Sequence, residues 1–217
     1  GDVISILNKV VAFVARQEKF LFSEISFSAI KMIFFYLFII LGFQLFLKFN
    51  TKRCFLFLGS ILAFQCVFIL EKYTIAQKSE LIVFHKSKNT IIGKRKGSSF
   101  EVYHSMDSLQ ISSQKLLINY KVGENISSQN YLKLSNLMYY KKQVVLIIDE
   151  DGLYDIKELN SPIVVLRQSP KINLQRLAEK LKPAIIIADG SNYKSYIENW
   201  KTTCENLKTP FWTTYNQ

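Results

Sequence analysis

The sequence is poor in the side chains that usually build disulfide frameworks and zinc centres. Cys54 and Cys66 lie in an apolar run and Cys204 stands alone, so neither a disulfide framework nor a CxxC zinc pattern is present. His85 and His104 have no partner at ligand spacing, and two isolated histidines cannot close a zinc site. Gly-x-Ser-x-Gly and P-loop patterns are missing as well. The sequence therefore predicts no catalytic residue, no resident metal and no cofactor.

Charged residues are also missing from two long apolar runs. Residues 32–47 and 54–70 each contain a single glutamine and no charge. A membrane span needs about 17–25 apolar residues, and it satisfies its backbone hydrogen bonds internally as a helix. We therefore expect a transmembrane hairpin within residues 28–72, with helices at about 30–49 and 54–70, the first capped by Ser28.

The polar segments around this hairpin predict its orientation. The connecting loop, residues 48–53, carries three cations and no acid, and positively charged loops stay in the cytoplasm. The N-terminal residues 1–27 and the polar residues 73–217 are then both expected on the outer face of the membrane. Apolar residues at helical spacing from Val3 to Arg16 indicate either a helix in the membrane interface or an ordinary packing helix.

The chain has an excess of basic residues, with a formal net charge of +11. Such a balance favours anionic lipid or nucleic acid as a partner, or simply a solvated surface. Lysine and arginine mixed with tyrosine can bind single strands, although the same residues also suit a solvated hairpin tip and core tyrosines. The candidate nucleic-acid contacts are Lys94, Arg95, Lys96, Lys141 and Lys142.

Residues 73–217 divide into two patterns. The first half has short β-rich runs that predict an antiparallel meander, with a helix over residues 130–142. The second half alternates buried strands with helices, which predicts a βαβαβ unit on a largely parallel sheet. The expected strands are 81–84, 90–92, 100–103, 116–118, 144–148, 163–166, 184–188 and 211–215, and the expected helix caps are Asn173 and Ser191.

Two short motifs have both a functional and a structural interpretation. The turn of Asp189, Gly190, Ser191 and Asn192 precedes a helix and could hold an anion. The structural interpretation needs Gly190 for a positive φ and Ser191 as a helix cap. An acidic cluster could bind a hard cation or be a solvated turn. Its members are Asp149, Glu150, Asp151 and Asp155.

Three stretches in order, residues 7–27, 81–103 and 182–212, carry a family resemblance. Together they resemble the C-terminal part of the ComEC family, the bacterial competence proteins that carry incoming single-stranded DNA across the inner membrane. The first resembles the family's interfacial helix and its entry into the last membrane helices. The other two resemble the start and the end of its metallo-β-lactamase-like domain.

The chain departs from the family pattern where catalytic relatives bind metal. The hairpin bend, acidic and glycine-rich in those relatives, reads His85-Lys-Ser-Lys-Asn-Thr90 here. The His-x-His-x-Asp-His segment has no counterpart, since residues 103–143 contain only His104. A second histidine-rich loop is replaced by Arg167-Gln-Ser-Pro170, which leaves Asp149 as the sole candidate ligand. One ligand cannot hold a catalytic zinc or manganese ion.

The resemblance implies a fold and a function for the whole chain. The fold would be a membrane α-helical hairpin plus an α/β domain, a shortened metallo-β-lactamase-like sandwich that has lost nuclease chemistry. The protein would be a multi-pass component of the bacterial inner membrane, part of a channel for single-stranded DNA. Its partners would be that DNA, the bilayer and the remaining channel helices, with self-association left open. Two alternatives remain: a metal-dependent nuclease, and a membrane-anchored interaction module without a nucleic-acid role.

Overall fold

The computed structural model describes three segments of the chain, which form two compact units. The units are Gly1–Leu70 and Glu71–Gln217. In the first, α1 (Asp2–Ala15) is an amphipathic helix. The predicted lead into the first membrane helix, residues 16–27, lies outside the described residues. The described segments are residues 2–15, 28–154 and 159–216.

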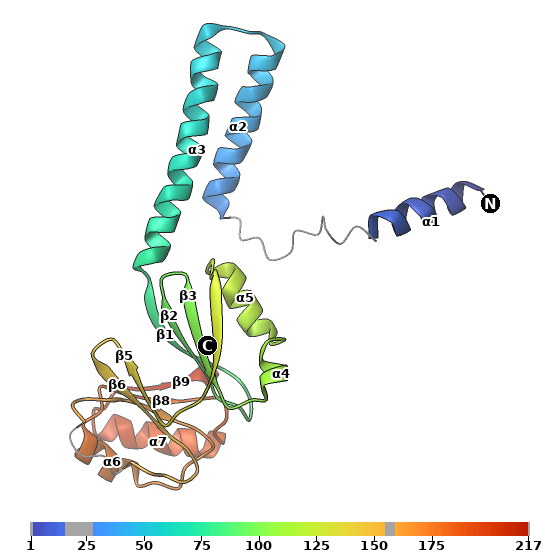
Figure 1. Ribbon diagram of the computed structural model, residues 1–217. Coiled ribbons are helices and arrows are strands. Elements are labelled where there is room, and N and C mark those ends of the chain that lie inside the picture. Colours follow the sequence, from blue (N-terminus) through green and yellow to red (C-terminus); the bar gives the residue numbers. More distant parts are fainter. Residues whose placement is uncertain (1, 16–27, 155–158, 217) are drawn as a thin grey trace. The chain divides into compact units, whose positions relative to one another are not determined.

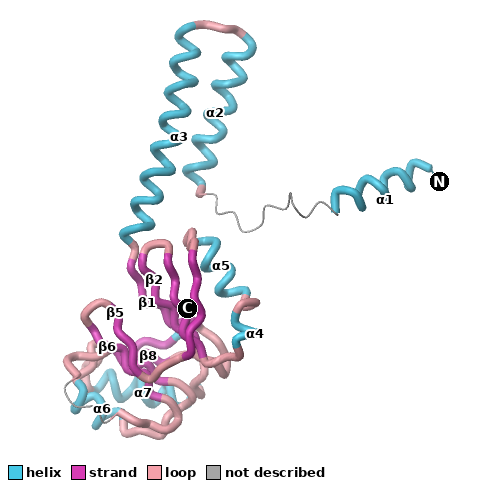
Figure 2. The backbone as a smooth tube through the Cα atoms, in the orientation of Figure 1, coloured by secondary structure: helices cyan, strands magenta, loops and turns pink. Residues whose placement is uncertain are grey.

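Two helices, α2 (Ala29–Leu47) and α3 (Thr51–Gln77), are long and apolar enough to cross a membrane. Ser28 caps α2 as predicted, because its hydroxyl accepts a hydrogen bond from the Lys31 amide. The two helices run antiparallel, as the tube in Figure 2 shows. Aromatic side chains pack between them, for example Phe38 against Phe57 at 5.1 Å between ring centroids.

The ends of this hairpin differ from the sequence prediction. The connecting loop is shorter than expected, since Lys52 and Arg53 already belong to the first turn of α3. Arg53 donates to the carbonyl oxygens of Gln44 (2.9 Å) and Lys48 (3.3 Å), and so caps the end of α2. The α3 helix continues past Leu70 to Gln77, because the polar residues that follow include good helix formers and neither glycine nor proline.

The second unit contains two mixed sheets. The first has the order β1-β2-β3-β4, where β1 to β3 form the predicted antiparallel meander and β4 pairs parallel to β3. Two short helices, α4 and α5, make the crossover to β4. The elements are β1 (Ser79–Phe84), β2 (Ile91–Lys96), β3 (Ser99–His104), α4 (Ser108–Ile111), α5 (Lys115–Gly123) and β4 (Ser128–Lys133).

The second sheet has the order β5-β6-β7-β8-β9, with β5 antiparallel and the other strands parallel. Helices α6 and α7 connect β7, β8 and β9, so the predicted βαβαβ unit is confirmed. The elements are β5 (Leu137–Tyr140), β6 (Gln143–Ile148), β7 (Ile163–Leu166), α6 (Leu174–Leu181), β8 (Ile185–Ala188), α7 (Lys194–Asn206) and β9 (Phe211–Thr213).

Three element predictions were wrong. The run 116–118 is helical, because Leu117 and its apolar neighbours pack one helix face against the first sheet. Residues 130–142 form parts of two strands instead of a helix, because β4 and β5 each find a partner strand. The last strand ends at Thr213, and a 3₁₀ turn, Thr214–Asn216, follows it.

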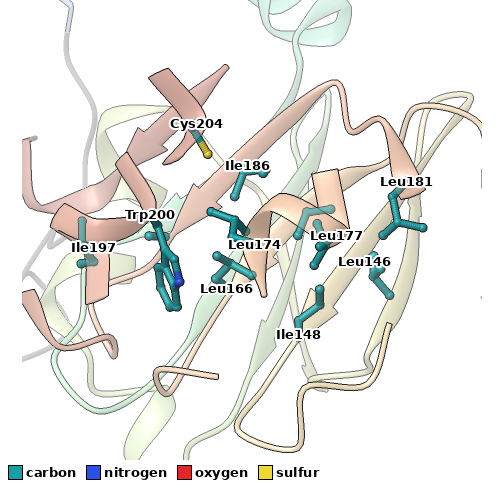
Figure 3. Close-up of a cluster of buried hydrophobic side chains, with 12 residues drawn as sticks. Leu146, Ile148, Leu166, Leu174, Leu177, Leu181, Ile186, Ile197, Trp200 and Cys204 are labelled. Atoms are coloured by element: carbon teal, nitrogen blue, oxygen red, sulfur yellow. The ribbon is translucent and has the colours of Figure 1, made fainter. Parts of the chain in front are cut away.

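Three apolar clusters arrange this unit in four layers. One cluster lies between the first sheet and helices α4 and α5, one between the two sheets, and one between the second sheet and helices α6 and α7. The ribbon shows the two helix pairs on the outer sides of the sheets (Figure 1). Figure 3 shows the third cluster, in which Leu177 and Trp200 point from the helices toward Leu166 and Ile186 of the sheet. The cores therefore fix both sheets and leave the loops at the strand ends to carry chemistry.

Candidate functional site at the strand ends

Four loops meet where strands of the two sheets end. They follow β1, β7, β8 and β9, and contacts between them join residues far apart in sequence. Thr90, just before β2, donates to Asp189, which follows β8 and lies 99 positions away. Arg167, which follows β7, donates from Nε to the Thr90 hydroxyl at 3.1 Å. Thr90, Arg167, Asp189, Ser191 and Asn192 together are called the strand-end site below.

Asp189 is the buried centre of this site, with 0% of its surface exposed. Its Oδ2 accepts from Thr90, and its Oδ1 accepts from the Ser191 amide (3.0 Å), the Ser191 hydroxyl (2.6 Å) and the Asn192 amide group (3.0 Å). Burial raises the pKa of Asp189, while hydrogen bonds from Ser191 and Thr90 and the positive charge of Arg167 oppose that rise. Both carboxylate oxygens are therefore occupied by protein donors.

Ser191 and Asn192 hold the loop after β7 in place. The Ser191 hydroxyl accepts from the Gln168 amide at 2.8 Å, and the Asn192 side chain accepts from the Ser169 amide at 2.7 Å. Both of those loop residues have a positive φ, 56° and 54°, a strained conformation that needs such anchors. Ser191 is thus not the predicted cap of α7, which begins after Tyr193 without a side-chain cap.

Gly190 is required for a reason other than the predicted positive φ, which the structure does not show. A Cβ at this position would lie 2.8 Å from His85 Nδ1 and 2.9 Å from the Lys86 amide nitrogen. The turn after β8 therefore packs directly on the loop after β1, and only glycine leaves room for that approach.

Basic and aromatic side chains form the rim of this edge. The His85 and Tyr215 rings meet edge to face at 4.7 Å between centroids, and His85 Nδ1 lies 3.1 Å from the Thr214 hydroxyl. The Lys194 ammonium lies 5.6 Å from the centre of the Tyr215 ring. Lys86 is bonded to the neutral amide of Gln114 at 2.9 Å, so its charge has no acidic partner there.

The donor set of the strand-end site does not fit a resident metal ion. No group of three or more His, Cys, Asp or Glu residues that could hold a metal occurs in the part of the chain that the structure describes. His104, buried at the end of β3, bonds through Nδ1 to the Met106 carbonyl at 2.9 Å. Asp149 follows β6 in a turn closed by a hydrogen bond from the Gly152 amide to the Asp149 carbonyl. Asp155 of the predicted acidic cluster lies outside the described residues.

The residues predicted to bind nucleic acid lie at the opposite end of the sheets. Ser79, which starts β1, pairs with Lys96 and accepts a hydrogen bond from the Tyr140 hydroxyl at 2.8 Å. That bond brings the β5–β6 hairpin turn, with exposed Lys141 and Lys142, to the Lys96 end of the first sheet. A DNA contact by these three lysines stays a prediction.

Arg95 does not belong to that exposed set, because its side chain is 0% exposed. It ion-pairs with Glu124 through Nη1 and donates from Nη2 to the Glu124 carbonyl at 3.0 Å. Its Nε donates to the Gly97 carbonyl at 2.8 Å. The neighbouring Lys94 is half-buried and pairs with Glu101 at 3.4 Å. The alternation of a strand explains the error, since it turns the middle member of a basic triplet inward.

Sequence reasoning missed Thr90 and Arg167 as members of a site. Thr90 lay at the start of an expected strand, and nothing local marks it. Arg167 stands where the family resemblance led us to expect a histidine-rich loop, and that departure was the one available signal. Their partnership with Asp189 depends on the packing of two sheets, which no sequence pattern encodes.

Two apolar helices and a four-layer α/β domain with a strand-end site define a class, a membrane-associated protein with a mixed-sheet polar domain. The family described as the ComEC C-terminal domain matches residues 81–217, and the chain belongs to this family. The predicted resemblance is thereby confirmed, and with it a family-level role in competence DNA uptake. Comparison with curated proteins gave no match, and neither did comparison with solved structures.

Proposed function

We propose that the chain is part of an inner-membrane channel that moves single-stranded DNA into the cell during natural transformation. The observation that carries the proposal is the family match over residues 81–217, preceded by two helices apolar enough to span a bilayer. In this proposal the polar domain lies on the outer face, and its four layers are a shortened metallo-β-lactamase-like sandwich.

The hairpin would join further channel helices in the bilayer. Large apolar side chains such as Ile33, Phe43 and Phe46 of α2 and Phe55 and Leu62 of α3 are exposed. A helix that is apolar all round needs lipid or other helices around it. This supports the bilayer and the remaining channel helices as partners.

We further propose that the outer domain acts on DNA without cutting it. At the strand-end site the oxygens of Asp189 are taken up by Thr90, Ser191 and Asn192, and a guanidinium lies beside them. Such an arrangement supports binding or gating, because neither oxygen of Asp189 is left free to act as a general base.

The channel role is tested by DNA uptake in the native host after deletion of the parent gene. Labelled duplex is followed into a cytoplasmic pool that external nuclease and protease cannot reach. We expect internalised single strands to disappear while DNA bound at the surface persists, and a plasmid copy of the gene to restore uptake. Unchanged uptake would favour the interaction-module alternative.

The absence of catalysis is tested on the purified full chain. We expect no degradation of labelled single-stranded DNA in the presence of Mg²⁺, Mn²⁺ or Zn²⁺, and no metal at one or two equivalents by elemental analysis. Nuclease activity that co-purifies with the chain and disappears on Asp189→Ala substitution would overturn this part of the proposal.

A further inference from the structure

The guanidinium of Arg167 is bonded at one nitrogen, and no described residue is bonded to the others. Its Nε donates to the Thr90 hydroxyl at 3.1 Å. Among the described residues, no acceptor or carboxylate is bonded to its two terminal nitrogens, and the side chain is only half-buried. An arginine has five N–H donors in a fixed fork, so the outward part of this fork is available to an oxyanion.

Buried side chains hold the Arg167 guanidinium in position. Asp189 and Thr90 are both 0% exposed, and the Thr90 hydroxyl donates a hydrogen bond to Asp189, so its oxygen is left to accept one from Arg167. The direction of both hydrogen bonds is therefore fixed: Arg167 donates to Thr90, and Thr90 donates to Asp189. A side chain anchored in this way loses little freedom when it binds, so the site is preorganised.

The surrounding loops favour a negatively charged ligand. The segments 85–90, 167–170 and 189–194 contain the four cations Lys86, Lys88, Arg167 and Lys194 and one acid, Asp189. The acids that follow β6, Asp149 to Asp151, form no ion pair with Arg167 among the described residues. Asp189 offsets one of these positive charges, and the described segments 85–90, 167–170 and 189–194 keep an excess of cations.

Aromatic rings on the same rim suit a nucleic acid strand better than a lone anion. Tyr215 is 38% exposed and Tyr193 is 72% exposed, and Lys194 lies over the Tyr215 ring. Exposed rings beside cations provide a surface on which bases stack while phosphates are neutralised. Charge and rings occur together here, whereas a lipid headgroup would use the charge alone.

We propose that Arg167 binds a backbone phosphate of single-stranded DNA at the strand-end site, with Thr90 as the residue that positions it. The inference rests on the proposed function and adds a specific site to it. That site lies at the opposite end of the sheets from Lys96, Lys141 and Lys142.

The test uses the full chain in neutral phosphatidylcholine nanodiscs and a short fluorescein-labelled oligothymidylate. Binding is measured by anisotropy over a series of salt concentrations for the wild type, Arg167→Ala and Arg167→Lys. The matched control is Arg176→Ala, which removes an exposed arginine from α6. Thermal unfolding followed by fluorescence of Trp200 and Trp212 shows whether each variant keeps its fold.

We expect Arg167→Ala to weaken binding roughly tenfold, because a charge-assisted bidentate contact is lost. The slope of log K against log salt should fall by about 0.7, the value for one phosphate contact of a single strand. Arg167→Lys should keep most of the slope and lose part of the affinity, and Arg176→Ala should change neither. Methylphosphonate oligothymidylate, which lacks the phosphate charge, should bind the wild type and Arg167→Ala equally.

The positioning role of Thr90 has its own comparison. Thr90→Ser keeps the hydroxyl and should bind DNA like the wild type. Thr90→Val removes it and should weaken binding while leaving the salt slope intermediate between the wild type and Arg167→Ala. If Thr90→Val and Thr90→Ser both fold and bind DNA with equal affinity, the positioning role of the Thr90 hydroxyl would be overturned.

The remaining outcomes separate the inference from the proposed function. Wild-type binding that Arg167→Ala leaves unchanged overturns the inference and leaves the channel role standing. A wild-type chain that does not bind the oligonucleotide at any salt concentration counts against both. If Arg167→Ala lost binding to phosphatidylglycerol vesicles and kept wild-type binding to DNA, the guanidinium would be assigned to a lipid headgroup and the inference would be overturned.

Discussion

Arg95 illustrates how much a single buried charge depends on its partners. It has no solvent exposure, and it meets Glu124, the Gly97 carbonyl and, at 3.9 Å, Glu80. Burial raises the pKa of Tyr120 to about 12, so its protonated hydroxyl donates to Glu80 at 3.1 Å. This group of side chains joins the β2–β3 hairpin to α5.

Substitution Arg95→Ala is expected to lower the stability of the polar domain by roughly 3 kcal/mol, because it removes one partner of a buried ion pair. The neighbouring Lys96→Ala substitution removes an exposed cation and should stay within about 0.5 kcal/mol. Both tryptophans lie in this domain, so thermal unfolding of the solubilised chain can be followed by their fluorescence. Equal effects of the two substitutions would contradict the buried position of Arg95.

Glu124 should make the domain sensitive to acid. Hydrogen bonds from Lys78 and Arg95 lower its pKa from the ordinary value of 4.5, with burial opposing them. A lowered pKa contributes stability above the ordinary value, and that contribution disappears as the pH falls through the lowered value. We therefore expect Glu124→Gln to lower the melting temperature at neutral pH and to approach the wild type in acid.

The control for this pH series is Glu205→Gln in the exposed pair of Lys201 and Glu205, 3.9 Å apart. Exposed pairs contribute little, so this variant should melt close to the wild type throughout. A constant difference between the wild type and Glu124→Gln down to strongly acidic pH would show that the carboxylate charge is not what matters at position 124.

The loop after β1, in the first sheet, packs against the loop after β8, in the second sheet, at Gly190. A Cβ on Gly190 would collide with His85 Nδ1 and with the Lys86 backbone, and backbone cannot move aside as a flexible side chain can. Close contact here also places Thr90 next to Asp189. The strand-end site therefore exists only while these two loops stay packed.

Gly190→Ala is expected to destabilise the domain by about 1–3 kcal/mol, the usual range for overpacking. It should also weaken DNA binding at Arg167 by displacing Thr90. Gly123→Ala is the matched control, because nothing lies within 4 Å of an added Cβ at the end of α5. That substitution should be neutral or slightly stabilising, since alanine favours a helix. Comparable melting temperatures for both variants would argue against the close approach.

For the molecule as a whole, the orientation in the membrane can be measured at two lysines. In a background without Cys54, Cys66 and Cys204, Lys48→Cys probes the hairpin loop and Lys142→Cys probes an exposed turn of the polar domain. We expect a membrane-impermeant maleimide to label position 142 in intact spheroplasts, and position 48 only after permeabilisation, since positive loops stay inside. The reverse pattern would place the polar domain in the cytoplasm.

Much of the secondary structure could be predicted, and the errors have physical causes. The β1 to β3 meander and the βαβαβ unit follow from patterns repeated over several residues. The run 116–118 was too short to separate a strand from a helix, and tertiary packing decided it. Residues 130–142 contain apolar residues at spacings that suit a helix, yet two strand partners outweigh that preference.

The amino-acid sequence by itself determined the two long apolar helices, the basic balance and the family, because hydrophobicity and motif order are local properties of the chain. Only the tertiary structure decided which cations face solvent and which groups share a site. It buries Arg95, whereas no described residue is bonded to the terminal nitrogens of Arg167, although both are arginines in short polar contexts. It also joins Thr90 to Arg167 across 77 positions and to Asp189 across 99, because the packing of two sheets brings their strand ends together.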